Sequence, residues 1–478
     1  MFSWIKINPG MVIFFSALIL RITWVATLRN GLIWPDEEEF AEIGRHLASG
    51  AGYVSNSYRA NPVLPFYLSA FLRLFGEFWL YPRIGQAIIG ALTCVILYRL
   101  TSMLAGETVG ILSGLLLALY PPQVYLSGVF YVECIATFLN MLSVYLVLIC
   151  IRSPHPVVVA VFAGAFMGLT ALTRAVFMPY VLVASLAMLY SAPTHRRTLM
   201  PAAVVLILAA VVVVAPWTLR NRTTFGRLII SSGFGETLWK GNNELANGGP
   251  DDRFMELGTP LWETRLNLLG SSYHAELIAK YTAVQDRIRD RYAETNDIYL
   301  ARDDVLGPLA AEGMRKHPVR TTGLFARKLL TLFQAFSDTK MRNQFTSGSK
   351  CLVAAVSFYP ILALAFVGLI LAAPRHRYFA PVYSLIFMWF AIHGLLTACT
   401  RFRLPMDPYL ILFACVALER FGDRILRAKQ LLAPPSTNSR ISETGTRKPA
   451  INLVGSEQGI ADNSRKPSSP SPLLFSRC

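Results

Sequence analysis

The chain has 478 residues, of which 54% are hydrophobic and only 15% are charged. A soluble protein normally carries about 25% charged residues, so this composition excludes an ordinary soluble domain. The net charge of +16 is spread over short loops and the C-terminal tail, without a basic and aromatic binding module, and this excludes nucleic acid as a partner.

Long apolar runs predict an all-α polytopic membrane protein, because a helix needs about 20 apolar residues to cross a bilayer. The first run has no clear small-residue cleavage site, and we interpret it as an uncleaved helix. The run 63–75 is too short to span and is expected to lie in the interface. We expect about ten transmembrane helices, near residues 11–28, 84–104, 108–126, 130–151, 157–173, 175–191, 199–217, 351–372, 378–398 and 406–420.

Basic residues in the short loops orient these helices. Arg152, Arg197 and Arg377 fall on the same side as the basic tail if the N-terminus is cytoplasmic. The first loop, residues 29–83, and the loop that holds Arg401 then face the exterior. We therefore expect the polar residues of these outer loops to share one face of the membrane.

The spans divide the chain into four expected parts. In the second part, charged pairs three and four residues apart predict helices at 276–294 and 298–316, while the Gly/Asn-rich stretch 231–250 is expected to be a loop. The parts are an N-terminal transmembrane catalytic module (1–217), a small extracytoplasmic α-rich segment (218–350), C-terminal transmembrane helices (351–420) and a cytoplasmic, largely disordered basic tail (421–478).

An acidic cluster, Trp34-Pro35-Asp36-Glu37-Glu38-Glu39, directly follows the first span. Pro35 blocks continuation of that helix, and Asp36 can cap a new one with acids in its first turn. The other interpretation is chemical, because a carboxylate at the interface can take a proton from an alcohol or amine as attack begins. The residues of the cluster alone leave both interpretations open.

Several arginines are expected at the same face. A bound anion would explain positive charge on the outer side, because a guanidinium grips phosphate through two hydrogen bonds. Snorkelling, or pairing with Glu133 and the acidic cluster, is the alternative. Arg21 lies within the first span, where it could face the same cavity or pair with Glu133. The outer arginines are Arg83 before the second span, Arg174 in a tight connection, and Arg401 and Arg403 in the last outer loop.

The order of these motifs resembles the bacterial relatives of the protein O-mannosyltransferases, which belong to the GT-C superfamily of glycosyltransferases. The resemblance covers roughly residues 10 to 420. It is carried by Asp36-Glu37, Asn61-Pro62-Val63-Leu64-Pro65-Phe66-Tyr67, Arg83, the run from Gly168 to Arg174, Ala215-Pro216-Trp217 with Arg220-Asn221, Trp239-Lys240-Gly241-Asn242-Asn243, and Arg401-Phe402-Arg403-Leu404-Pro405.

The resemblance implies an inverting transfer of a sugar from a polyprenyl-phosphate donor to a glycan, lipid or protein acceptor outside a bacterial inner membrane. Asp36 would be the base, and Glu37 would orient the acceptor or hold a divalent metal, which some relatives use and others do not. Relatives often have His or Lys before the Pro-rich run, where this chain has Asn61, so that a basic contact to substrate would be either absent or supplied by Arg59. The remaining substrate-binding candidates are Arg83, Glu133, Arg174, Trp239, Asn242, Asn243, Arg401 and Arg403.

A transporter or flippase for an anionic lipid or solute is the rival hypothesis. Transporters usually place their coupling charges near the midplane, in two related halves with broken helices. Here most charges gather at one face and no inverted repeat is visible, although Arg21 favours the rival. Trp239 to Asn243 could also be a simple Gly-rich turn rather than an acceptor entrance.

Overall fold

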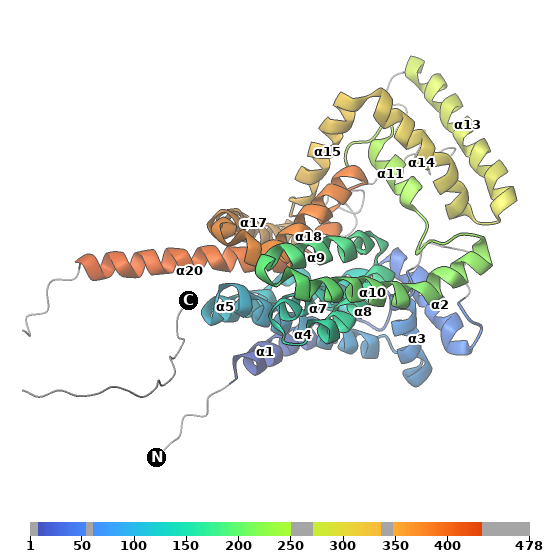
Figure 1. Cartoon of the computed structure of the whole chain (residues 1–478). Helices are drawn as coiled ribbons and strands as arrows, with labels where there is room; N and C mark the ends of the chain where they lie inside the picture. Colours follow the sequence, from blue (N-terminus) through green and yellow to red (C-terminus); the bar gives the residue numbers. More distant parts are fainter. Residues whose placement is uncertain (1–7, 54–60, 250–270, 336–347, 433–478) are drawn as a thin grey trace, which may run out of the picture. The chain divides into compact units, whose positions relative to one another are not determined.

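The computed structural model describes residues 8–53, 61–249, 271–335 and 348–432, and these residues form helices without any strand. The all-α prediction is therefore confirmed for this part of the chain (Figure 1). Each of the ten expected spans coincides with a helix or a pair of helices. These are α1 (Pro9–Ala26), α4 (Leu80–Ala105), α5 (Glu107–Leu119) with α6 (Pro121–Tyr125), α7 (Val132–Arg152), α8 (Pro156–Thr173), α9 (Met178–Ser191), α10 (Arg196–Phe225), α17 (Gly348–Ala372), α18 (His376–Leu395) and α20 (Asp407–Leu432).

Length and composition support a multi-pass membrane protein, although they do not establish ten spans. Within the described residues, six helices are long and apolar enough to cross a membrane, or seven if the bent pair of α5 and α6 is one span. One of the six, Lys350–Leu395, comprises most of α17 and all of α18. The short run expected in the interface forms α3 (Val63–Phe75), which follows α2 (Pro35–Ser49).

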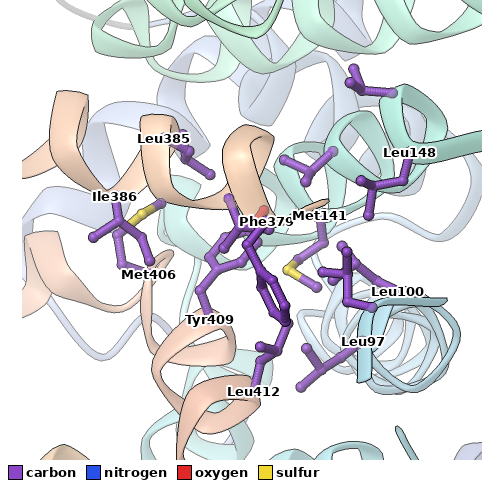
Figure 2. Close-up of a cluster of buried hydrophobic side chains, with 14 of the residues drawn as sticks. Leu97, Leu100, Met141, Leu148, Phe379, Leu385, Ile386, Met406, Tyr409 and Leu412 are labelled. Atoms are coloured by element: carbon purple, nitrogen blue, oxygen red, sulfur yellow. The ribbon is translucent and has the colours of Figure 1, made fainter. Parts of the chain in front are cut away.

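The largest apolar core joins helices that are distant in the sequence. Figure 2 shows Leu97 of α4, Met141 of α7, Leu385 of α18 and Tyr409 of α20 converging on one another. All of these side chains are buried. The N-terminal and C-terminal transmembrane parts expected from the sequence therefore share a single core.

Small residues let α8 and α10 approach closely. A Cβ added at Gly164 would lie 2.1 Å from the carbonyl oxygen of Leu206, and one at Gly168 would lie 2.8 Å from that of Ala210. This four-residue spacing of glycines is the pattern by which membrane helices pack backbone against backbone. The close packing fixes the direction in which the C-terminal ends of both helices point.

Arg21 connects neighbouring helices through hydrogen bonds in this structure. Its side chain is buried, and its guanidinium donates hydrogen bonds to the carbonyl oxygens of Ala17 and Ala118 and to the sulfur of Cys94. The expected pairing with Glu133 is not observed, because Glu133 binds other arginines. Arg21 thus links α1 to α4 and to the end of α5.

The segment after α10 forms a helical cap, made of α11 (Phe234–Asn242), α13 (Ser271–Thr295), α14 (Ile298–Lys316) and α15 (Pro318–Leu332) (Figure 1). The helices expected at 276–294 and 298–316 are confirmed as α13 and α14. A small core that includes Trp239, Tyr281 and Leu306 holds α11, α13 and α14 together. Residues 250–270 and 336–347 lie outside the described part of the chain.

The prediction that 231–250 is a loop is wrong for residues 234–242, which form α11. The carboxylate of Asp303, on α14, accepts hydrogen bonds from the backbone N–H groups of Gly233 at 2.7 Å and Glu236 at 3.0 Å. These N–H groups open a helix and would otherwise lack an acceptor. The cap therefore comes from a residue about seventy positions away, which local composition could not reveal.

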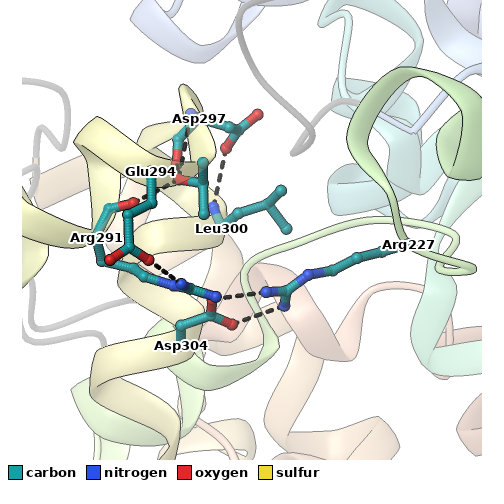
Figure 3. A network of polar contacts seen from close by, with 7 residues as sticks. Arg227, Arg291, Glu294, Asp297, Leu300 and Asp304 are labelled. Atoms are coloured by element: carbon teal, nitrogen blue, oxygen red, sulfur yellow. Dashed lines mark hydrogen bonds and ion pairs between the residues drawn. The ribbon is translucent and has the colours of Figure 1, made fainter.

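A charge network fastens the cap to the end of α10 (Figure 3). Asp304 accepts two hydrogen bonds from Arg227, each 2.6 Å long, and a third from Arg291 at 2.8 Å. Arg291 also pairs with Glu294. The neighbouring Asp297 caps α14 by accepting from the N–H groups of Tyr299 and Leu300.

The prediction of a disordered tail from residue 421 is wrong for residues 421–432. Residues 421–432 continue α20, which ends at Leu432. The remainder, 433–478, lies outside the described residues.

Candidate active site

Arg83 organises the loop between α1 and α2. Its side chain is buried, and it donates to the carbonyl oxygens of Gly128 and Arg29, both at 2.9 Å, and of Gly31. The sequence suggested that Arg83 binds phosphate, but in the structure carbonyl oxygens surround its guanidinium. In this structure Arg83 holds the loop that leads to the acidic cluster.

Glu37 is fully buried and bonded to backbone. Its Oε2 atom accepts from the N–H of Trp34 at 2.9 Å and from that of Ile33, and its Oε1 accepts from the N–H of Phe130 at 2.6 Å. The start of α2 is therefore capped by Glu37, whereas the sequence suggested Asp36 for that role. Glu37 fixes α2 against the connection that precedes α7.

Asp36 is left facing outward by this arrangement. Its side chain is 43% exposed, and its Oδ2 accepts a hydrogen bond from Nη1 of Arg401 at 2.8 Å. A half-exposed carboxylate, held in place by an arginine and by a rigid first helical turn, is accessible to a second molecule. Of the acid pair, Asp36 is the one whose side chain is exposed.

Arg401 continues the polar chain inward from Asp36. Its Nε donates to Oε1 of Glu133 at 2.8 Å, and its guanidinium lies 3.9 Å from the ring centre of Tyr131. Burial alone would lower the pKa of Arg401. The negative charge of the nearby Glu133 carboxylate has a larger effect, so the pKa of Arg401 is raised above its ordinary value. The two interactions fix the guanidinium in one orientation.

Arg174 completes this group. Its Nη1 donates to the same Oε1 atom of Glu133 at 3.0 Å, and its guanidinium packs 4.4 Å from the ring centre of Phe402. Asp36, Arg401, Glu133 and Arg174 thus form a continuous chain, which we call the acid–arginine cluster. Two carboxylates and two guanidinium groups balance its formal charge.

Arg403 lies in a different environment from Arg401. It is buried, pairs with Asp407 at 2.8 Å, and donates to the carbonyl oxygens of Leu332 and Gln334. These contacts tie α19 (Thr400–Arg403) to α20 and to the end of α15. The structure does not bring Arg403 into the acid–arginine cluster, and Arg59 lies outside the described residues.

The expected acceptor residues on α11 mainly hold the cap in place. Trp239 is buried against Tyr281, with ring centres 5.7 Å apart. Asn242 donates to the carbonyl oxygen of Leu395 at 2.8 Å and accepts from Nζ of Lys328, also at 2.8 Å. The carbonyl oxygen of Asn243 accepts from Arg320 at 2.7 Å. These contacts join α11, α15 and the end of α18.

A cavity of about 660 Å³ opens beside the last turns of α8. Leu172, in its wall, lies two residues before Arg174, so the cavity lies near one end of the acid–arginine cluster. The wall is mainly apolar, and Arg220 is the charged residue that lines it. The lining residues are Tyr53, Pro62, Val63, Phe66, Leu169, Leu172, Val213, Pro216, Trp217 and Arg220.

The guanidinium of Arg220 contacts three aromatic rings at this cavity. Its guanidinium lies 5.0 Å from the ring centre of Trp217, 5.2 Å from that of Tyr53 and 5.3 Å from that of Phe225. It also donates to the carbonyl oxygen of Tyr53 at 3.1 Å. Arg220 belonged to a motif of the sequence resemblance, but it was assigned no role from the sequence. Its position shortly after Pro216-Trp217, near a helix end, could have marked it as a candidate site residue.

A divalent metal does not fit the acids found here. Both oxygens of Glu37 accept backbone N–H groups, and one guanidinium already bridges Asp36 and Glu133. Over the described ranges, no group of three or more His, Cys, Asp or Glu side chains is arranged to hold a metal ion.

Comparison with known proteins places this geometry in a known fold. Residues 59–219 match the family described as dolichyl-phosphate-mannose-protein mannosyltransferase. The apo oligosaccharyltransferase of Archaeoglobus fulgidus is 15% identical, with a TM-score of 0.52 over 90% of this chain and 52% of that one. The chain has a GT-C glycosyltransferase fold. The resemblance to this superfamily seen in the motifs is thus confirmed.

Two further solved structures are similar to this chain. The same archaeal oligosaccharyltransferase with zinc and sulfate is 16% identical, with a TM-score of 0.52 over 89% of this chain and 51% of that one. ArnT from Cupriavidus metallidurans in the apo state is 15% identical, with a TM-score of 0.39 over 89% of this chain and 81% of that one. No curated protein matches the sequence. The chain spans about half the length of the archaeal structures that it matches.

Proposed function

We propose that the protein is an inverting glycosyltransferase, which moves a sugar from a polyprenyl-phosphate donor to a glycolipid, polysaccharide or protein. We place the reaction at the outer face of a bacterial inner membrane, following the distribution of basic loops. The observation that carries the proposal is the half-exposed Asp36, linked through Arg401 and Glu133 to Arg174.

The cavity suits the lipid part of such a donor. A polyprenyl chain is a long hydrocarbon, and the wall of the cavity is mainly apolar. Arg220 lies at this wall and has a guanidinium able to grip a phosphate through two hydrogen bonds. We assign the isoprenoid to the cavity and the phosphate to Arg220, with Arg174 and Arg401 as further phosphate contacts.

The chemistry follows from this placement. The acceptor oxygen or nitrogen attacks the anomeric carbon from the side opposite the phosphate, which inverts the configuration. The bond from that carbon to the phosphate oxygen breaks, and its electron pair stays on the phosphate. Asp36 takes the proton from the acceptor as attack begins, while the arginines stabilise the charge that develops on the phosphate.

Sugar transfer by purified protein tests the proposal. The protein in nanodiscs would receive a radiolabelled sugar on undecaprenyl phosphate, together with an envelope fraction that contains glycans and glycoproteins. We expect label in the acceptor fraction and release of undecaprenyl phosphate. Movement of the intact donor across the membrane, without cleavage, would support the transporter hypothesis instead.

A further inference from the structure

Arg401 lies between two carboxylates that come from different helices. Its Nη1 binds Oδ2 of Asp36, on α2, and its Nε binds Oε1 of Glu133, on α7, both at 2.8 Å. A divalent cation could also bridge two such oxygens, because hard cations bind carboxylates from separate elements. The guanidinium therefore occupies the place that a bridging metal would take.

Glu37, the nearest further acid in the sequence, is not free to complete a metal site. Its two oxygens accept three backbone N–H groups, from Ile33, Trp34 and Phe130. Glu37 is also fully buried. Turning its carboxylate toward a metal would leave those donors without an acceptor, and this is strongly unfavourable for buried groups.

The charge balance of the acid–arginine cluster also disfavours a divalent ion. Two carboxylates already face two guanidinium groups, because Arg174 binds the same oxygen of Glu133 as Arg401 does. A divalent cation would add two positive charges to a cluster in which Glu133 is completely buried. Displacing Arg401 instead would leave its guanidinium on the ring of Tyr131 without a carboxylate.

We propose that Arg401 does the work of a divalent cation in this site, so that sugar transfer by this chain needs no metal. The proposal rests on the proposed function. Arg401 bridges Asp36 and Glu133 and stabilises the negative charge on the phosphate as the bond to the anomeric carbon breaks. The proton of the acceptor passes to Asp36, and the electron pair of the broken bond stays on the departing phosphate.

Two measurements on the full-length protein test this inference. The first compares sugar transfer in EDTA with transfer in added Mn²⁺ or Mg²⁺, and we expect equal rates. The second follows free Mn²⁺ by electron paramagnetic resonance during titration. We expect negligible binding by the wild type and measurably tighter binding by Arg401→Ala, because this change leaves Asp36 and Glu133 without their bridging cation. Arg401→Lys, which keeps one positive charge, should stay closer to the wild type.

Arg45 offers a matched control. It also bridges two acids, Glu38 and Glu77, at 2.6 and 2.8 Å, but all three side chains are at least 34% exposed. Arg45→Ala should keep wild-type transfer and should not bind Mn²⁺ with the affinity of Arg401→Ala.

Three results decide the matter. Loss of wild-type transfer in EDTA that Mn²⁺ restores would overturn the inference and leave the glycosyltransferase proposal standing. Failure of a folded Arg401→Ala protein to bind Mn²⁺ more tightly than the wild type would also overturn it. Absence of transfer by folded wild-type protein, with or without metal, would count against the proposed function itself. If Arg401→Ala does not fold, the EDTA comparison on the wild type and the Arg401→Lys titration still decide.

Discussion

The carboxylate of Asp36 and the guanidinium of Arg401 are 2.8 Å apart in space, although 365 positions separate them in the sequence. Asp36 belongs to the first turn of α2, and Arg401 belongs to the short helix α19 just before α20. Their pairing draws both ends of the transmembrane chain into one site. Its chemistry can be tested separately from its contribution to stability.

Asp36→Asn should abolish most transfer without changing the fold. The amide keeps the size of the side chain and can still accept from Arg401, but it cannot take a proton from the acceptor. Loss of a general base typically lowers rates by about 10²–10⁴-fold. The check is the transfer rate at saturating donor, together with the thermal unfolding temperature.

Glu38→Gln is the matched control for this change, because Glu38 lies two residues further along α2 and is exposed. It should keep full activity. A folded Asp36→Asn protein with wild-type activity would remove Asp36 from the role of base.

Glu37→Gln should lower stability rather than act on the chemical step alone. An amide has one oxygen where Glu37 uses two, so at least one buried N–H loses its acceptor, at a cost of about 1–3 kcal/mol. Transfer should fall together with stability, because the loop that carries Asp36 loosens. Thermal unfolding and hydrogen exchange of residues 31–37 measure this effect. Full stability combined with lost transfer would instead place Glu37 among the groups that contact substrate.

The sequence was sufficient for much of the fold because membrane helices are encoded by their own composition. Each apolar run that predicted a span became a helix, and charge pairs three and four apart located α13 and α14. The helix α11 was missed because its cap comes from Asp303, a tertiary contact. Local patterns show which residues are helical but not which distant side chain completes a helix end.

The candidate site was predictable as a set of charges but not as a set of contacts. Asp36, Glu133, Arg174 and Arg401 do lie together. Arg403, two residues after Arg401, points into the core and pairs with Asp407, because successive residues of a helical turn face different directions. The cavity beside Arg220 is built by the packing of several elements, so no local motif specifies its shape.

Leu172→Trp should weaken binding of a long-chain donor by filling the cavity. A larger side chain at this wall removes space for hydrocarbon, so KM for undecaprenyl-phosphate sugar should rise by about tenfold, equivalent to roughly 1.4 kcal/mol. KM for a donor with a short lipid chain should change little. Donor titrations with both chain lengths provide the measurement.

Leu182→Trp is the control, because Leu182, on α9, is 57% exposed at the apolar surface. It should leave both KM values unchanged. An equal loss for long and short donors in Leu172→Trp would argue against the cavity as the lipid site.

Asp304→Asn should loosen the cap at neutral pH. Burial alone would raise the pKa of Asp304. Hydrogen bonds from Arg227 and Arg291 have a larger effect together and hold this pKa below its ordinary value. Such a group stabilises the cap above its ordinary pKa of about 3.9, and the effect disappears as pH falls through the lower folded value. We expect a loss of about 1–2 kcal/mol at pH 7, allowing for the partial exposure of both arginines.

Hydrogen exchange of α13 and α14, compared between variants at each pH, measures this loss. The difference between Asp304→Asn and the wild type should shrink below about pH 4. Asp286→Asn is the control, since Asp286 pairs with Arg289 on the exposed face of α13. A difference that stays constant from pH 7 to pH 3 would show that the charge of Asp304 is not the cause.

Lys328 gives the cap a second dependence on pH, which has the same sign as that of Asp304 but lies in an alkaline window. Its side chain is buried and donates to Oδ1 of Asn242 and to the carbonyl oxygen of Leu395. Burial, with a smaller effect from the charge of Arg320, lowers the pKa of Lys328 to about 8 from its usual 10.5. Between these two values the unfolded chain binds more protons than the folded protein. Stability attributable to Lys328 therefore rises with pH across that window.

Lys328→Met removes this titration and keeps a long side chain. The unfolding free energy of the wild type, minus that of Lys328→Met, should increase by about 2–3 kcal/mol between pH 8 and pH 10. The variant also loses the hydrogen bonds of Lys328. Below pH 8, where Lys328 is charged in both the folded and the unfolded protein, this loss changes the free-energy difference by a constant amount. Tryptophan fluorescence during thermal unfolding in nanodiscs, at pH 7 to 10, measures the difference. Lys280→Met, at an exposed site paired with Glu244, should show no such rise, and a flat difference for Lys328→Met would mean that Lys328 stays protonated in the folded protein.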